Sequence, residues 1–207
     1  MKKKRIVKQP EIRRLEIMAV AKQLFENQGY EQTPVDQIIQ VAGIAKGTFY
    51  YYFKTKKDIL TALVDSMVLQ LEDHFKNLIK DRKLSALEKL QRMLRGSEKK
   101  EIINPDLMES VHLVENREMQ EALNMRLVDT IALLIAEVLQ QGYQEKIFKK
   151  EASTQEVQII LAGSQFILDS GLFSWSSEEQ VAWLNAIRNL LALLTDTEPT
   201  IFEFVLN

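Results

Sequence analysis

The residues most able to do chemistry lie close together between positions 45 and 57, where the sequence reads AKGTFYYYFKTKK. Lys46 can donate hydrogen bonds to guanine O6 and N7 or to a phosphate, and Thr48 can contact a base edge or a thymine methyl group. Gly47 has no side chain, so the backbone there can come close to a DNA strand. The stretch therefore predicts contact with nucleic acid.

The aromatic residues after Thr48 divide between two faces if the segment is helical. Phe49 and Phe53 are four residues apart, so both should face the core. Tyr50 and Tyr51 would then point outward, where a phenol hydroxyl can hydrogen-bond to a phosphate. In isolation, however, residues 48–53 have high β propensity and also fit a strand.

Three lysines follow the aromatic run, at positions 54, 56 and 57. Lys56 and Lys57 stand at the start of the next expected helix, where a positive charge is slightly unfavourable because that end of a helix is itself positive. A phosphate that meets these side chains would explain their place. A lysine run is also a common solvated surface, so spacing and charge alone leave DNA binding and a plain basic surface both open.

Helix-start and helix-end signals predict the elements that position these residues. The sequence from Thr33 to Asp36 combines a capping-box pattern with a proline at the first helical position. Gly43 can adopt the sharp turn that a helix-turn-helix unit needs, and the second helix of such a unit enters the major groove. The three short helices expected here span 10–28, 34–41 and 45–52.

The remainder of the chain has the composition of a helical protein. Only 7 Gly and 4 Pro occur among 207 residues, and there is no Cys, so disulfides and thiolate metal sites are excluded. Capping-box patterns recur, apolar residues repeat at helical spacing, and Gly142 falls where one helix is expected to end. We therefore expect an all-α fold. Its further helices are expected at 56–81, 86–95, 105–120, 121–141, 154–173 and 177–196.

The net charge of −2 hides an asymmetry between two parts of the chain. Residues 1–60 carry 12 Lys/Arg and 6 Asp/Glu, whereas residues 61–207 carry 15 and 23. A basic module on an acidic body predicts that the first 60 residues meet a polyanion. The longest apolar run has six residues, from 131 to 136, which is too short to span a membrane, and no apolar segment follows the basic start. We expect a soluble, cytoplasmic protein.

The N-terminal part closely resembles the DNA-binding domain of the TetR/AcrR family of bacterial transcriptional regulators. The resemblance covers about residues 10–60 and implies that residues 48–53 form a helix, not a strand. It rests on three stretches of the sequence: TPVDQI at 33–38, AGIAKGTFYYYFK at 42–54 and KKDIL at 56–60.

The resemblance also implies a role for each matching position. Thr33 and Tyr51 are expected to contact phosphates, and Lys56 is expected to anchor the DNA backbone. Lys54 belongs to the same expected interface. Outside the stretch that the resemblance covers, the basic start of the chain, residues 1–9, is expected to add an arm that could reach the minor groove or flanking phosphates. Ala45 departs from the family, which often has Ser there, so the helix lacks a side-chain cap. The groove-facing set is Lys46, Gly47, Thr48 and Tyr50.

Beyond residue 60 the resemblance implies a helical domain for effector binding and dimerisation, over residues 61–207. The helices near 154–173 and 177–196 are expected to pair with those of a second subunit as a four-helix bundle. Their broad apolar stripes exceed what one packing partner requires. Two-fold symmetry would place the recognition helices about 34 Å apart and require double-stranded DNA with a pseudo-palindromic operator.

The effector site is the least determined feature. Soft methionine side chains can line an adaptable cavity, although most methionines are simply core residues. Asp169 interrupts an apolar stretch and could face solvent, pair with an arginine across a dimer, or meet a cationic ligand. Glu109 and His112 have the Glu-x-x-His spacing of di-iron bundles but lack the second pair, so no metal or cofactor is expected. The candidate effector residues are Met67, Met93, Met108, His112, Phe166 and Asp169.

These observations favour a homodimeric, ligand-responsive DNA-binding repressor without catalytic activity. No serine-hydrolase elbow, P-loop or dinucleotide fingerprint occurs in the sequence. Two alternatives stay open: a constitutive DNA-binding protein without an effector, and a helical enzyme or protein-interaction module whose basic face is incidental.

Overall fold

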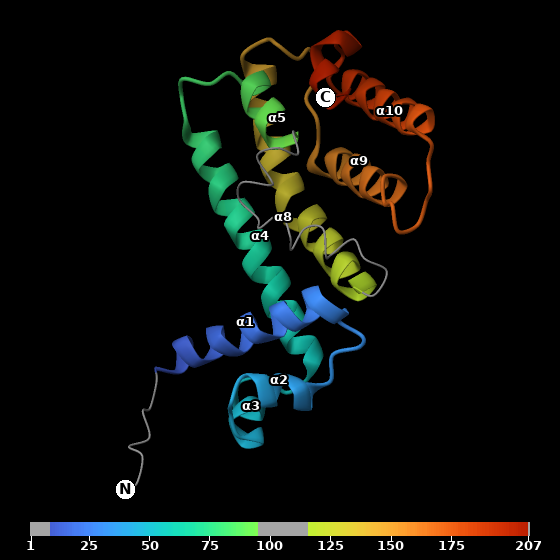
Figure 1. The fold of residues 1–207 in the computed structure, drawn as a ribbon. Coiled ribbons are helices and arrows are strands. Elements are labelled where there is room, and N and C mark those ends of the chain that lie inside the picture. The colour runs from blue at the N-terminus through green and yellow to red at the C-terminus, as the bar shows by residue number, and fades with distance from the viewer. Residues whose placement is uncertain (1–8, 95–115, 207) are drawn as a thin grey trace, which may run out of the picture.

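The computed structural model describes residues 9–94 and 116–206. Within these residues every regular element is a helix, so the expected all-α fold is confirmed. Figure 1 shows a small unit at one end of the molecule, and the long helix α4 rises from it into a larger helical body. None of the helices in the described ranges is both long enough and apolar enough to cross a membrane.

The small unit consists of α1 (Pro10–Gln28), α2 (Val35–Val41) and α3 (Lys46–Tyr52), as the sequence predicts. Pro10 occupies the first turn of α1, and Gly43 turns the chain between α2 and α3 with a φ of +61°. That angle favours glycine because a Cβ atom would be strained there. The three helices enclose a fully buried core that includes Ile17, Ile38 and Phe49.

Helix α4 (Lys56–Lys80) runs unbroken from the small unit into the body, as expected. Its start is fixed by a capping box in which Thr55 accepts a hydrogen bond from the backbone N–H of Asp58, and Asp58 binds back to the backbone at Thr55. The corresponding pattern at Thr33 does not form. Thr33 is buried and donates to the carbonyl of Gly29 at 2.7 Å, and Pro34 takes the N-cap position of α2. A buried hydroxyl needs a nearby acceptor, and that carbonyl satisfies it.

The body is built around α8 (Arg117–Gln144), which packs beside α4 and α5 (Ala86–Leu94). The expected break between residues 120 and 121 is wrong, because nothing there interrupts the helical backbone. Gly142 does not end the helix either: it lies inside α8, where a Cβ atom would come within 2.2 Å of Phe148. Close packing therefore explains this glycine. The expected helix at 105–120 lies mostly outside the described residues.

The last elements are α9 (Thr154–Ile167), α10 (Ser177–Thr195) and the 3-10 segment η2 (Pro199–Leu206). The expected end of α9 at residue 173 is wrong. Asp169 accepts a hydrogen bond from the N–H of Gly171 at 2.8 Å, and the indole N–H of Trp175 donates to the carbonyl of Ile167 at 2.8 Å. These two contacts fold the chain back after Ile167. The sequence reading did not include η2.

Candidate nucleic-acid interface and ligand cavities

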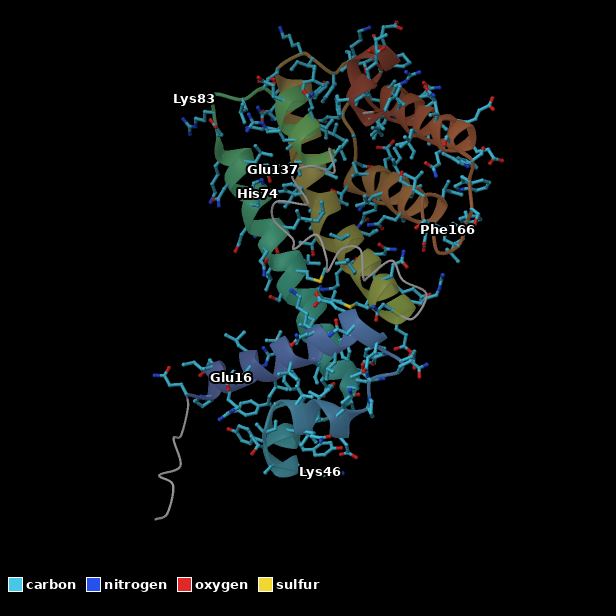
Figure 2. All side chains as sticks on the ribbon, viewed as in Figure 1. Glu16, Lys46, His74, Lys83, Glu137 and Phe166 are labelled. Atoms are coloured by element: carbon cyan, nitrogen blue, oxygen red, sulfur yellow. The ribbon has the colours of Figure 1, made fainter. Side chains whose placement is uncertain are left out.

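Helix α3 presents the predicted interface at the free end of the small unit. Tyr51 is 73% exposed and Tyr50 38% exposed, while Phe49 and Phe53 are buried beneath them. The two phenylalanines fix the rotation of α3 about its axis, so the neighbouring tyrosines point outward, as the spacing predicts. Figure 2 shows Lys46 at this same end of the molecule, distant from the larger body.

The beginning of α3 is open to approach by a large ligand. Lys46 and Gly47 are exposed and Thr48 is half-buried. A Cβ atom at Gly47 would meet no atom within 4 Å, so the space in front of it is free. Ala45 precedes α3 at the N-cap position without a side-chain hydrogen bond, as expected from its residue type.

The lysines of the interface are held only lightly. The ammonium Nζ of Lys46 lies 3.3 Å from Oδ1 of Asp36, and both side chains are well exposed. Such surface ion pairs contribute about 0–1 kcal/mol, so a phosphate or base can displace the carboxylate. Lys54, two residues after the end of α3, is exposed, and its ammonium donates to the carbonyl of Tyr50 at 2.8 Å.

Two residues assigned to DNA by resemblance are instead engaged within the protein. Thr33 is buried, with its hydroxyl bound to Gly29. The ammonium of Lys56 donates to the carbonyls of Tyr30 at 2.7 Å and Glu31 at 3.2 Å, and it lies 4.2 Å from the centre of the Tyr30 ring. Neither side chain joins the exposed set on α3.

Tyr30 is a functional candidate that the sequence reading missed. Its ring is buried, and burial raises the pKa of its phenol to about 12, with further effects from Glu118 and Glu31. It therefore stays neutral under Lys56 at ordinary pH. The only signal in the sequence was its place two residues after an expected helix end.

Within the described part of the body, two neighbouring cavities lie between α8 and α9. The inner cavity, of about 310 Å³, reaches α10 and has a mostly apolar lining that includes Ile135, Ile160 and Leu184. The outer cavity, of about 540 Å³, is open to solvent and has a lining that includes Arg117 and Glu121, which form an ion pair at 3.0 Å. Asn124 and Gln165 line both cavities.

The predicted effector residues separate into three groups. Phe166 and Asp169 line the outer cavity, and Figure 2 shows Phe166 on α9. Met67 and Met93 are buried core residues that line neither of the two cavities. Met108 and His112 lie outside the described residues, as does Glu109. The residues 9–94 and 116–206 hold no group of three or more His, Asp or Glu side chains that could bind a metal.

An exposed apolar stripe follows one face of α9. Ile159 is 72% exposed and Phe166 56% exposed, and between them on the same helical face lie the exposed residues Ala162 and Gly163. Helix α10 likewise exposes Leu190 and Leu193. These faces are unusual for a solvated surface and leave two small residues where another helix could approach closely.

The fold and the exposed recognition helix define a helix-turn-helix DNA-binding protein with a separate helical body. Residues 17–63 match the family described as bacterial regulatory proteins, tetR family, and residues 100–190 match the tetracyclin repressor-like C-terminal domain. The chain belongs to the TetR family of transcriptional regulators. It is a DNA-binding regulator and not an enzyme.

Several proteins are similar over most of the chain. The fatty acid metabolism regulator protein of Bacillus subtilis (strain 168) is 27% identical, and the match covers 89% of this chain and 96% of that protein. A crystal structure of FadR from Bacillus subtilis in complex with stearoyl-CoA is 25% identical, with a TM-score of 0.61 over 89% of this chain and 99% of that one. A TetR-family protein from Syntrophomonas wolfei, 21% identical with a TM-score of 0.62 over 96% and 97%, shares the fold.

Proposed function

We propose that this chain is a cytoplasmic, homodimeric repressor that leaves a pseudo-palindromic operator when a small-molecule effector binds its body. The observation that carries the proposal is the open start of α3 at one end of the molecule, together with a cavity of about 310 Å³ at a distance from it. We divide the chain into a DNA-binding domain at 1–60, with a basic arm at 1–9, and an effector-binding and dimerisation domain at 61–207.

The proposed DNA contacts combine positioning and reading of bases. Tyr51 and Lys54 are placed to meet phosphates, which fix the register of a protein on DNA without reading sequence. Lys46 and Thr48 lie at the start of α3, the part of a recognition helix that faces base edges. Lys56 keeps a supporting role, because its ammonium holds Tyr30.

The proposed dimer forms through α9 and α10. The stripe from Ile159 to Phe166 has small residues at its centre, and the exposed leucines of α10 extend the same kind of surface. Burial of such a face stabilises association by about 25 cal/mol per Å² of apolar area, before the costs of association. Two subunits would present two copies of α3 to successive major grooves.

The proposed effector has a large apolar part and a polar end. Ten of the fourteen residues that line the inner cavity are apolar, and its polar groups come from Gln120, Asn124, Ser164 and Gln165. The full-length similarity to a fatty acid metabolism regulator, and to a structure in complex with stearoyl-CoA, makes a long-chain acyl thioester the first candidate. Release of the operator then follows as a population shift. An effector that binds more tightly to the state whose two recognition helices do not match the spacing of the operator half-sites lowers the occupancy of the operator.

Operator binding in the presence and absence of stearoyl-CoA tests this proposal. The DNA is a duplex selected from a random pool by the purified protein, and the wild type should lose affinity for this selected duplex when stearoyl-CoA is added. Ile160→Trp places an indole in the inner cavity and should bind the duplex but resist release. The control Leu69→Trp, at an exposed position on α4, should behave as the wild type. Equal release of both variants would contradict the assignment of the inner cavity.

A further inference from the structure

Asn116 stands where the body meets the DNA-binding unit. It immediately precedes α8 and is fully buried. An asparagine at this position usually caps its own helix, but here the side chain makes no such bond. Its Nδ2 instead donates to the carbonyl of Phe25 at 3.2 Å, and its Oδ1 accepts from the N–H of Tyr30 at 2.6 Å. The side chain therefore ties the start of α8 to the end of α1.

The contacts continue from Tyr30 to the element that follows the recognition helix. The carbonyl of Tyr30 accepts a hydrogen bond from Lys56, the first residue of α4. Helix α3 ends only a few residues earlier, at Tyr52. One residue, Tyr30, thus connects Asn116 to Lys56, four residues after the end of α3. The two hydrogen bonds of Asn116 are buried, and a buried polar group that loses its partner is destabilising, so these contacts resist separation.

On its other side, Asn116 is continuous with the walls of both cavities. Arg117, Glu121 and Asn124 line the outer cavity, and Gln120 lines the inner one. All four belong to the first turns of α8, directly after Asn116. A ligand that shifts these turns must move the residue that precedes them, since a helix is a rigid element over two turns.

We propose that Asn116 is a positioning residue that couples the cavities to the recognition helix, through its paired hydrogen bonds to Phe25 and Tyr30. The inference rests on the proposed function, and it adds a second connection beside α4. It predicts that the coupling is reciprocal, so that DNA binding at α3 must also change the first turns of α8.

Hydrogen exchange on operator binding tests the connection without any effector. In the wild type, addition of the selected duplex should change the exchange of residues 117–124. Asn116→Ala should bind the duplex but lose that change, while the matched control Asn77→Ala, at an exposed position on α4, should keep it. No change in the wild type, or an unaltered change in Asn116→Ala, would overturn the proposal.

A second variant guards against a general loss of folding. Asn116→Asp keeps an acceptor for the N–H of Tyr30 and loses the donor to Phe25, so it should show a reduced change in residues 117–124. Its melting temperature should lie between those of the wild type and Asn116→Ala. A full wild-type response in Asn116→Asp together with a lost response in Asn116→Ala would assign the coupling to the Tyr30 bond alone and overturn the paired form proposed here.

Release of the operator by stearoyl-CoA distinguishes a failure of this inference from a failure of the proposed function. Where stearoyl-CoA weakens operator binding by the wild type, Asn116→Ala should bind stearoyl-CoA equally well and lower that effect by about 2-fold to 30-fold. Release equal to that of the wild type would overturn the coupling role. Failure of stearoyl-CoA to bind the wild type would contradict the proposed effector, and the hydrogen-exchange result would still decide the role of Asn116.

Discussion

At the scale of single residues, Lys46 and Tyr51 lie on the same exposed helix and should make different contacts with DNA. Lys46→Ala should lose discrimination at one base position, worth about 1–3 kcal/mol for a good base contact. Tyr51→Phe removes only a hydroxyl and should weaken binding to the operator and to random DNA alike. Competition binding with single-base variants of the operator measures both effects. Unchanged specificity in Lys46→Ala would reject Lys46 as a reader of bases.

Gly142 makes a prediction about stability alone. A Cβ atom there would lie 2.2 Å from Cε2 of Phe148, so Gly142→Ala should lower the free energy of unfolding by about 1–3 kcal/mol, the usual cost of overpacking. Denaturant unfolding checks this value. The double variant Gly142→Ala/Phe148→Leu, which removes the contacting ring atoms, should recover part of the loss. Equal stability of Gly142→Ala and the wild type would show that Phe148 moves aside at no cost.

The same residue scale shows where the sequence was informative. The alternation of Phe49 and Phe53 with outward tyrosines could be predicted, because a four-residue spacing fixes one face of a helix. The internal partners of Thr33 and Lys56 could not, because the carbonyls that they bind belong to Gly29, Tyr30 and Glu31, whose direction depends on the loop that follows α1.

At the scale of elements, helix starts are the most predictable features. Capping boxes form at Thr55, Ser153 and Ser176, as their residue patterns indicate. Helix ends were harder to predict. Helix α9 stops at Ile167, whose carbonyl accepts from the Trp175 indole, while Asp169 binds the N–H of Gly171 beyond the helix end. Such contacts depend on how the chain folds after the helix.

The carboxylates of the capping boxes predict that the unfolding free energy depends on pH in the acidic range. Hydrogen bonds from backbone N–H groups, and then from the capping hydroxyls, hold the pKa of Asp58 below its ordinary 3.8 and the pKa of Glu156 and Glu179 below their ordinary 4.5. A lowered pKa in the folded state stabilises it above the unfolded pKa, and this contribution is lost as pH falls. Unfolding free energies should therefore decline below about pH 4.5.

Glu179→Gln tests that acid dependence at one cap. The variant has no carboxylate to protonate in the capping box of α10, so its unfolding free energy should fall less steeply than that of the wild type between pH 5 and pH 3, roughly the range in which Glu titrates. Urea unfolding at several pH values measures the slope. An identical slope in the two proteins would show that this cap does not contribute to the acid dependence.

The exposed apolar faces of α9 and α10 lead to a prediction about the oligomeric state of the protein. Leu193 is 74% exposed, and Leu193→Glu would place a charge in the proposed apolar interface. The variant should sediment as a monomer, or dissociate at a far higher concentration than the wild type, while its helical content stays the same. Leu69→Glu, at an exposed position on α4, is the matched control and should remain dimeric. A dimeric Leu193→Glu would place the interface elsewhere.

At the scale of the whole molecule, charge and shape act together. The basic first 60 residues contain an exposed recognition helix, and the acidic remainder contains the cavities. The sequence predicted this division from charge and from resemblance. The cavities could not be predicted, because their lining residues come from helices that are distant in sequence and meet only in the folded body.

Selection of bound duplexes from a random pool by the purified protein, followed by sequencing, tests the central claim most directly. Two copies of α3 related by two-fold symmetry predict an inverted repeat whose half-site centres are about one DNA turn, roughly 34 Å, apart or a multiple of it. Recovery of such a repeat would establish sequence-specific recognition by a dimer. Recovery of no motif, at a salt concentration where binding persists, would contradict the proposed repressor.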